Sequence, residues 1–210
     1  MIAIVDYGAG NISSVKKALE HLGATAEVTS DPQVIAQAEK LVVPGVGHFN
    51  RCLPLNRQLR LPLLDSFSSG KPFLGICVGM QWLFEGSTES PETSGAGLFP
   101  GECGRFPAGV KCPHVGWNQI EVRRDSRLLH GVESGAFVYY THSYRAPVGD
   151  DTVASSEYGG EFSAAVERDN VFGVQFHPEK SSDAGLQILR NFLAVVQQRS
   201  IGARRAEAGC

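Results

Sequence analysis

Short apolar runs of strand length alternate along the first half of the chain with segments whose apolar residues recur every three or four positions. The first helical segment follows Asn11, a suitable N-cap, and ends at Gly23. A second begins at Asp31-Pro32, because proline is favoured directly after a capping residue. This alternation predicts βα units and a parallel sheet with sites at the carboxyl ends of its strands. The expected strands are Ile2–Val5, Ala26–Val28, Leu41–Val43 and Phe73–Ile76.

The second half of the chain is richer in expected strands. Between Gly86 and Gly109 the composition shifts to Gly, Pro, Ser and Glu, which favours a long surface loop. A last helix is expected at about Asp183–Val196. Its inward residues would be Leu186, Leu189, Phe192, Leu193 and Val196, and the strands before it are Trp117–Val122, Phe137–Thr141, Val153–Ser156, Phe162–Glu167 and Val171–Phe176.

We therefore expect a single α/β domain over residues 1–196. It should contain a mostly parallel central sheet with helices on both faces, and additional antiparallel strands in the second half. Residues 197–210 show no apolar period and are expected to form a flexible tail.

Composition narrows the class of protein. Of the 210 residues 42% are hydrophobic and 20% are charged, which is ordinary for a soluble globular protein. The formal net charge of -3 gives no electrostatic reason to bind nucleic acid or an anionic membrane. No apolar run approaches the ~20 residues of a membrane span, and the N-terminus lacks the features of a signal peptide. We expect a cytoplasmic protein with no nucleic-acid or membrane partner.

The number of cysteines, five, is odd, and no Cys-x-x-Cys pair occurs, so neither a disulfide framework nor a zinc site is indicated. The glycine-rich segment Pro44–Gly47 lacks the spacing of a phosphate-binding loop. We expect no metal and no cofactor.

One cysteine stands in a segment that suggests chemistry. Cys77 lies within Gly75-Ile76-Cys77-Val78-Gly79, where a buried strand passes directly into a helix expected over Val78–Phe84. Cysteine here takes the place of serine in a nucleophile elbow. The flanking glycines have a steric reason, because side chains in so tight a turn would collide with neighbouring backbone. The free N–H groups of the helix start favour a thiolate at Cys77. A buried structural cysteine is the alternative interpretation.

A cysteine nucleophile requires a base, and the base requires a group that orients it. His177 follows the strand Val171–Phe176, and Pro178 disfavours helical geometry at His177. In an extended segment, residues two apart face the same way, so His177 and Glu179 should project together. Alone, this motif would favour a polar loop after an edge strand over a catalytic pair; together with the Cys77 elbow it predicts a Cys–His–Glu triad.

Acyl transfer also requires N–H donors at the oxygen that becomes negative. The backbone N–H of Val78, at the helix start, is one candidate. The second is expected from the strand-end loop of Gly45, Val46 and Gly47, where glycines let the backbone approach a substrate.

These motifs together resemble the class I, or triad, glutamine amidotransferases. Within that class, further segments resemble the glutaminase subunits of imidazole glycerol phosphate synthases, in the same order along residues 1 to about 196. The elbow and the His-Pro-Glu segment are shared by the whole class, whereas the first and fourth of the following segments point to these subunits. The segments are Asp6–Ile12, Pro44–Gly47, Cys77–Gln81, Pro113–Asn118, Tyr140–Tyr144 and Gly173–Ser182.

The resemblance implies a flavodoxin-like glutaminase fold and hydrolysis of L-glutamine to glutamate and ammonia through a cysteinyl thioester. It implies a heterodimer with a (β/α)₈-barrel cyclase that uses the ammonia to make imidazole glycerol phosphate and aminoimidazole carboxamide ribotide in histidine biosynthesis. By the same resemblance Cys77, His177 and Glu179 are the triad. The implied oxyanion and glutamine contacts are Gly45, Val46, Gly47, Val78, Gln81, Glu89, Ser143 and Tyr144, and the implied partner-facing residues are Asn11, Trp117, Tyr139 and Lys180.

Two residues depart from the family pattern. His48 stands where a small residue is common, and Val78 stands where leucine is commoner. Three alternatives stay open: the glutaminase of another triad amidotransferase, such as that of pyridoxal phosphate or anthranilate synthesis, a free-standing γ-glutamyl hydrolase, and a regulatory module without catalysis. The first should lack the Pro113–Asn118 and Asp6–Asn11 segments, and the intact triad argues against the third.

Overall fold

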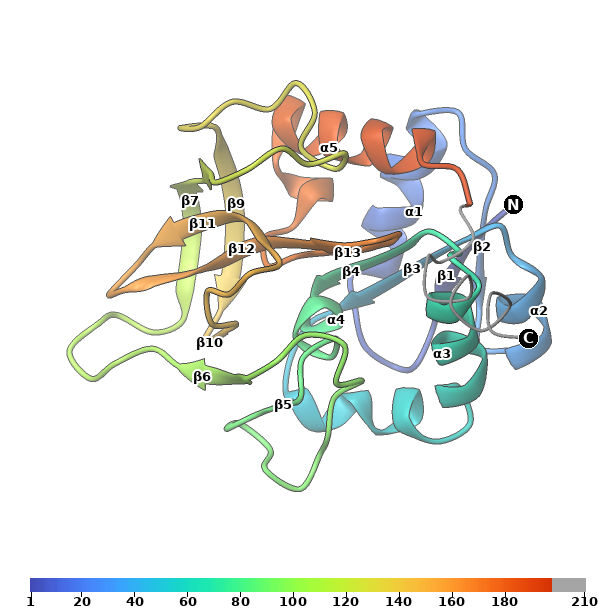
Figure 1. The fold of residues 1–210 in the computed structure, drawn as a ribbon, viewed down its shortest axis with the longest axis horizontal. Coiled ribbons are helices and arrows are strands. Elements are labelled where there is room, and N and C mark those ends of the chain that lie inside the picture. The colour runs from blue at the N-terminus through green and yellow to red at the C-terminus, as the bar shows by residue number, and fades with distance from the viewer. Residues whose placement is uncertain (198–210) are drawn as a thin grey trace, which may run out of the picture.

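The computed structural model describes residues 1–197, and a central eight-stranded sheet organises them (Figure 1). Its strands are β1 (Ile2–Val5), β2 (Ala26–Thr29), β3 (Lys40–Gly45), β4 (Phe73–Cys77), β8 (Glu121–Val122), β11 (Thr152–Glu157), β12 (Glu161–Arg168) and β13 (Val171–Val174). They lie in the order β2-β1-β3-β4-β13-β12-β11-β8. Neighbours from β2 to β13 are parallel, and neighbours from β13 to β8 are antiparallel. The predicted mixed sheet is confirmed.

Helices cover both faces of this sheet, as predicted. Helices α1 (Ile12–His21) and α5 (Ser182–Ala194) lie on one face, and α3 (Arg60–Ser68) and α4 (Val78–Gln81) lie on the other (Figure 1). Helix α2 (Pro32–Gln37) packs beside α3, and two 3₁₀ helices, η1 (Phe49–Asn56) and η2 (Pro178–Lys180), complete the set within residues 1–197. The predicted cap of α2 is confirmed, because the Asp31 side chain accepts a 2.8 Å hydrogen bond from the N–H of Gln33.

The helix after Cys77 is shorter than predicted, since α4 ends at Gln81 and not at Phe84. Carbonyl groups that follow Gln81 hydrogen-bond to another segment of the chain. The carbonyls of Trp82 and Phe84 accept hydrogen bonds from the N–H groups of Ala96 (2.6 Å) and Gly97 (3.0 Å), respectively. These bonds satisfy the two carbonyls, and after Gln81 the chain continues only in tighter turns, in which Leu83 and Phe84 donate their N–H groups to the carbonyls three residues before them.

The stretch from Gly86 to Gly109 was wrongly predicted to be a surface loop. It contains β5 (Gly86–Ser87) and β6 (Glu102–Arg105), which form a three-stranded sheet with β10 (Tyr144–Arg145). Phe99, Ser90 and Thr93 within it are buried. The hydroxyl groups of Ser90 and Thr93 lie 2.9 Å apart and hydrogen-bond to each other. Two polar residues whose type suggests a surface position are therefore paired in the interior.

The last helix also needs correction at its end. Helix α5 stops at Ala194, which leaves the side chain of Val196 67% exposed where an inward position was expected. Leu189 and Phe192 are buried as predicted, and Ile188 shares their face. Residues 198–210, the greater part of the predicted tail, lie outside the described residues.

A separate two-stranded ribbon stands at one end of the molecule (Figure 1). It consists of β7 (His114–Gln119) and β9 (Phe137–His142), so the single strand predicted over Trp117–Val122 is in fact divided between β7 and β8. Buried His114 anchors the ribbon, because its ring stacks on Tyr140 at 4.8 Å and on Tyr158 at 4.0 Å between centroids.

Candidate active site

The elbow predicted around Cys77 is present. Cys77 is the last residue of β4 and adopts φ 54° and ψ −111°, a conformation that L-residues rarely take. A Cβ on Gly79 would lie 1.9 Å from the carbonyl oxygen of Val43, and one on Gly75 would lie 2.6 Å from that of Gly79. Both glycines are therefore required by close backbone approach, as the sequence predicted.

The histidine and the glutamate come from the strand next to the elbow. Strand β13 is parallel to β4, with Val174 opposite Ile76, so both strands end at the same edge of the sheet. Beyond β13, Nδ1 of His177 lies 2.9 Å from Oε1 of Glu179, and both side chains are almost fully buried. The pairing is confirmed, but Glu179 lies in the 3₁₀ turn η2 and not in an extended segment. The turn, not strand alternation, brings the carboxylate to the ring.

Charge controls the protonation of this histidine. Burial lowers the pKa of His177, but the interactions with Cys77 and Glu179 outweigh burial, so the pKa is raised from its ordinary value. Nε2 of His177 is buried and makes no hydrogen bond of normal geometry. The arrangement favours the imidazolium form of His177 beside Cys77.

Asn11 has a role that its position did not predict. It is the residue before α1, but its side chain makes no capping bond. Instead Nδ2 donates a 3.2 Å hydrogen bond to Oε1 of Glu179, the same oxygen that faces His177. The second oxygen, Oε2, is buried without a partner. Two donors thus converge on one carboxylate oxygen.

A cavity of about 290 Å³ opens beside the sulfur of Cys77. Most of the residues predicted to contact oxyanion or substrate line it, while Gly45 and Val46 do not. The lining residues are Gly47, Cys77, Val78, Gln81, Glu89, Pro113, Thr141, His142, Ser143 and Tyr144. Sequence reasoning did not single out Pro113, Thr141 or His142, although all three stand in segments that carry the family resemblance.

The loop beside this cavity differs from expectation in one respect. Gly45 is still part of β3, where a Cβ would lie 2.5 Å from the Tyr7 hydroxyl. The turn comes later, at Gly47, whose φ of 95° favours glycine. The unusual His48 is exposed and caps η1, accepting a 3.2 Å hydrogen bond from the N–H of Asn50.

The residues predicted to face a partner form one cluster next to the His–Glu pair. The rings of Trp117 and Tyr139 meet edge to face at 5.9 Å, and Nζ of Lys180 lies 5.7 Å from the centre of the Tyr139 ring. Trp117 is 49% exposed. Asn11 joins this cluster through Glu179.

Comparison with known proteins decides the family. The family model for "Glutamine amidotransferase class-I" matches residues 3–196 of the chain. The chain belongs to the class I glutamine amidotransferases. Among curated relatives of this amidotransferase, imidazole glycerol phosphate synthase subunit HisH of Methanothermobacter thermautotrophicus is 50% identical over 94% of this chain and 100% of its own. The protein of the same name from Salinibacter ruber is 46% identical over 96% and 98%.

Solved structures show the same fold. The structure of PurLQS from Thermotoga maritima matches the amidotransferase with a TM-score of 0.74, at 20% sequence identity, over 91% of this chain and 96% of that chain. At this identity the likeness concerns the fold alone.

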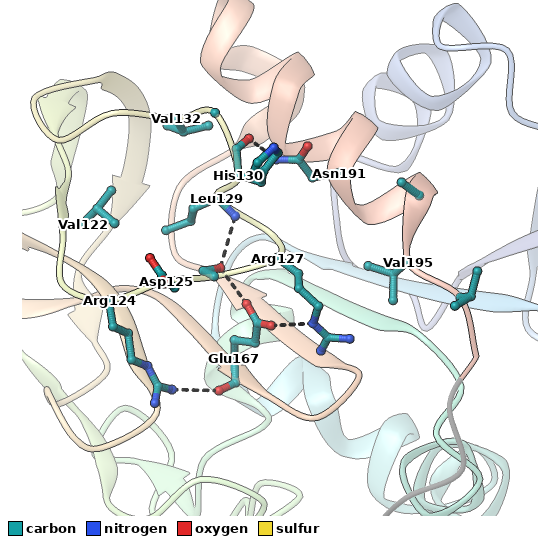
Figure 2. A pocket seen from close by; sticks show the side chains of 14 residues that line it. Val122, Arg124, Asp125, Arg127, Leu129, His130, Val132, Glu167, Asn191 and Val195 are labelled. Atoms are coloured by element: carbon teal, nitrogen blue, oxygen red, sulfur yellow. Dashed lines mark hydrogen bonds and ion pairs between the residues drawn. The ribbon is translucent and has the colours of Figure 1, made fainter.

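A second cavity of the amidotransferase lies away from Cys77. Its volume is about 850 Å³, and it lies between α5 and the segment that follows β8 (Figure 2). Arg127 and Ser126 both hydrogen-bond to Glu167 at its wall, and Arg124 donates to the Glu167 carbonyl. Arg124 and Arg127 are exposed and also paired. Because these charged groups bind one another, this cavity has no feature that favours a particular ligand.

No cluster of three or more histidine, cysteine or acidic residues that could hold a metal ion occurs in residues 1–197. The same part of the amidotransferase contains no helix long and apolar enough to cross a membrane.

Proposed function

We propose that this amidotransferase is the glutaminase subunit of an imidazole glycerol phosphate synthase, acting in the cytoplasm. It hydrolyses L-glutamine and passes the ammonia to a (β/α)₈-barrel cyclase. The cyclase combines ammonia with a phosphoribulosyl-formimino nucleotide to give imidazole glycerol phosphate and aminoimidazole carboxamide ribotide. Nearly full-length likeness to two proteins that carry this subunit name supports the proposal.

The observation that carries the catalytic part is the combination of a strained elbow cysteine with a buried, carboxylate-paired histidine. Cys77 is the proposed nucleophile. Its sulfur forms a bond to the side-chain carbonyl carbon of glutamine, and the electron pair of that carbonyl moves to oxygen. The amide nitrogen then takes a proton from Nε2 of His177, the C–N bond breaks, and ammonia leaves. A thioester with Cys77 remains.

Water completes the cycle. His177, now neutral, accepts a proton from a water molecule as the water oxygen attacks the thioester carbon. The C–S bond breaks, the product leaves as the side-chain carboxylic acid and gives its proton to solvent to become glutamate, and the thiolate–imidazolium pair is restored. Glu179 holds Nδ1 protonated throughout, so that Nε2 remains the nitrogen that exchanges protons.

The oxyanion formed in each half-reaction requires N–H donors. We propose the N–H of Val78, at the start of α4, as the first. The second comes from the Gly45–Gly47 segment, whose glycines allow more than one peptide orientation. Gln81, Glu89 and the backbone of Ser143 and Tyr144 are proposed to hold the rest of the glutamine in the cavity.

The proposed docking face for the cyclase consists of Asn11, Trp117, Tyr139 and Lys180. An exposed tryptophan beside a tyrosine and a lysine is the composition of an interface anchor. The face contacts Glu179 through Asn11, so docking can influence the triad directly.

The test is glutaminase activity with and without cyclase and its nucleotide. We expect slow hydrolysis by the isolated chain, strong stimulation by the nucleotide-loaded partner, and complete loss in Cys77→Ala. The Cys77→Ala complex should still use added ammonium, because ammonia reacts at the partner's site. Full turnover by the chain alone, unchanged by the partner, would refute the subunit role and favour a free-standing hydrolase.

A further inference from the structure

A buried glutamine that does not line the substrate cavity contacts the sulfur of Cys77. Gln175 follows β13 and is completely buried. Its Nε2 donates a hydrogen bond to Sγ of Cys77 at 3.7 Å, within the range for sulfur acceptors. The same sulfur has a second contact, with the carbonyl oxygen of Thr141 at 3.9 Å. Gln175 therefore approaches the nucleophile from within the protein, whereas substrate enters from the cavity.

The orientation of the Gln175 amide is fixed by a second glutamine. Nε2 of Gln81 donates to Oε1 of Gln175 at 3.0 Å and to the carbonyl oxygen of Tyr144 at 2.8 Å. Because Gln81 presents a donor, Gln175 must present its carbonyl to Gln81 and its NH₂ group to the sulfur. The opposite orientation would set two donors against each other.

These two contacts of the sulfur favour opposite protonation states. A carbonyl oxygen such as that of Thr141 accepts an S–H bond and favours the thiol. An amide N–H donates to a negative charge and favours the thiolate, and such charge-assisted bonds are stronger than neutral ones.

We propose that Gln175 is a positioning residue for the glutaminase reaction, which donates its side-chain N–H to the Cys77 sulfur and so stabilises and fixes the thiolate. This inference rests on the proposed function, since it assumes that Cys77 is the nucleophile. Gln81 and the Tyr144 carbonyl, both at the substrate cavity, hold the amide in this orientation. The wall of the cavity is thereby joined to the reacting atom through hydrogen bonds.

The test measures the rate at which iodoacetamide alkylates Cys77 as a function of pH, read from the Cys77 peptide by mass spectrometry. Gln175→Met keeps the length of the side chain and removes the donor. The midpoint of the pH profile should rise by about one pH unit, which corresponds to roughly tenfold less thiolate below both midpoints. Gln175→Glu should raise the midpoint further, because a carboxylate repels a second negative charge.

The matched control is Gln187→Met on α5, where the glutamine bonds only to Asn191 of the same helix among the contacts described. Its midpoint should equal that of the unchanged chain. An unchanged midpoint in folded Gln175→Met, or a lowered one in Gln175→Glu, overturns the inference. If the methionine variant does not fold, Gln175→Asn is measured in its place. Its side chain is one methylene shorter, so the amide N–H no longer reaches the sulfur, and the midpoint of the pH profile should rise in the same way.

Steady-state kinetics with the cyclase separates this role from a merely structural one. At neutral pH, Gln175→Met should lower kcat about tenfold and leave KM for glutamine within about twofold, and higher pH should restore kcat. An equal loss of kcat at every pH contradicts the inference.

A glutamine analogue carrying an electrophile tells the two proposals apart. If it fails to label Cys77 in the unchanged chain, the proposed function fails; if it labels Cys77 and the midpoint does not move, only the role of Gln175 fails.

Discussion

Replacing Glu179 by glutamine should remove one charge from the proposed triad and leave its geometry in place. Nδ1 of His177 and Nδ2 of Asn11 both lie against Oε1, at 2.9 Å and 3.2 Å, and Oε2 has no partner. The carbonyl of a glutamine can accept both bonds, with its NH₂ group in the place of Oε2. Because Asn11 is a donor, it holds that carbonyl toward His177, whose Nδ1 keeps its proton.

The cost of Glu179→Gln then follows from the charge alone. A hydrogen bond to a charged group contributes about 1.5–3 kcal/mol and one between neutral groups about 0.5–1.5 kcal/mol, so the loss for the bond to His177 is about 1–1.5 kcal/mol. That corresponds to roughly a tenfold fall in kcat. The direction agrees with the electrostatics, because the carboxylate is one cause of the raised pKa of His177, and its removal makes the imidazolium less stable.

Glu179→Ala should cost far more, because His177 loses the group that fixes its tautomer. Loss of a triad orienter with the wrong tautomer lowers kcat by about 10⁴-fold. The double variant Asn11→Ala/Glu179→Gln should approach that loss, since the amide is then free to turn its NH₂ group toward His177. The two changes should therefore be strongly non-additive.

The assay is glutamate release at saturating cyclase and nucleotide, with ammonium-dependent turnover as the control for assembly. We expect about a tenfold loss for Glu179→Gln, a few-fold loss for Asn11→Ala, and about 10³-fold or more for the double variant. If Glu179→Gln alone were as inactive as Glu179→Ala, the claim that Asn11 sets the orientation of this group would be wrong.

Three further predictions concern other parts of the site. His48→Ala should keep most activity, because His48 caps η1, whereas His177→Ala should lose several orders of magnitude in kcat; equal losses would reassign the base. Gly79→Ala should lower the free energy of unfolding by about 3 kcal/mol in denaturant titrations, while Gly104→Ala, with no atom within 4 Å of the added Cβ, should change it by under ~0.5 kcal/mol. Trp117→Ala and Lys180→Ala should each weaken cyclase binding about tenfold or more by calorimetry, with a smaller effect on the basal glutaminase rate.

The sequence predicted those parts of the site that lie within short contiguous segments. The elbow is five residues long, from Gly75 to Gly79, and the base and its orienter are two residues apart. The alternation of strands and helices then predicts a parallel sheet, in which strand ends meet at one edge. The proximity of Cys77 and His177 could therefore be predicted, although the pairing of β4 with β13 was not itself predicted.

Contacts between distant segments were missed for a physical reason. Asn11 and Glu179 are 168 positions apart, and the residue before a helix favours capping when only local sequence is considered. Gln175 stands beside an apolar run, where no local pattern shows that two buried amides will satisfy each other. The buried Ser90–Thr93 pair misled for a different reason, because two hydroxyl groups only three positions apart satisfy each other. Burial of a polar group depends on its tertiary partner, and periodicity carries no information about that partner.

The nucleophile and the base follow neighbouring strands of the sheet, but the outer ribbon contacts only the segment of the base. Cys77 ends a central strand of the sheet, and the glycines around it leave almost no space for movement. The segment that carries His177 and Glu179 continues from β13 and is also held by the outer ribbon. The Tyr139 carbonyl accepts the N–H of His177 at 2.9 Å, and the Tyr139 N–H donates to Oγ of Ser181 at 2.9 Å.

The ring of Tyr139 meanwhile belongs to the exposed cluster with Trp117 and Lys180. One residue therefore holds the base through its backbone and faces the proposed partner through its side chain. We expect a partner that shifts the ribbon to displace the His177 segment relative to Cys77. Since a shift of a catalytic group by about 1 Å can change a rate by roughly 10²-fold, small movements of this ribbon suffice to make hydrolysis depend on docking.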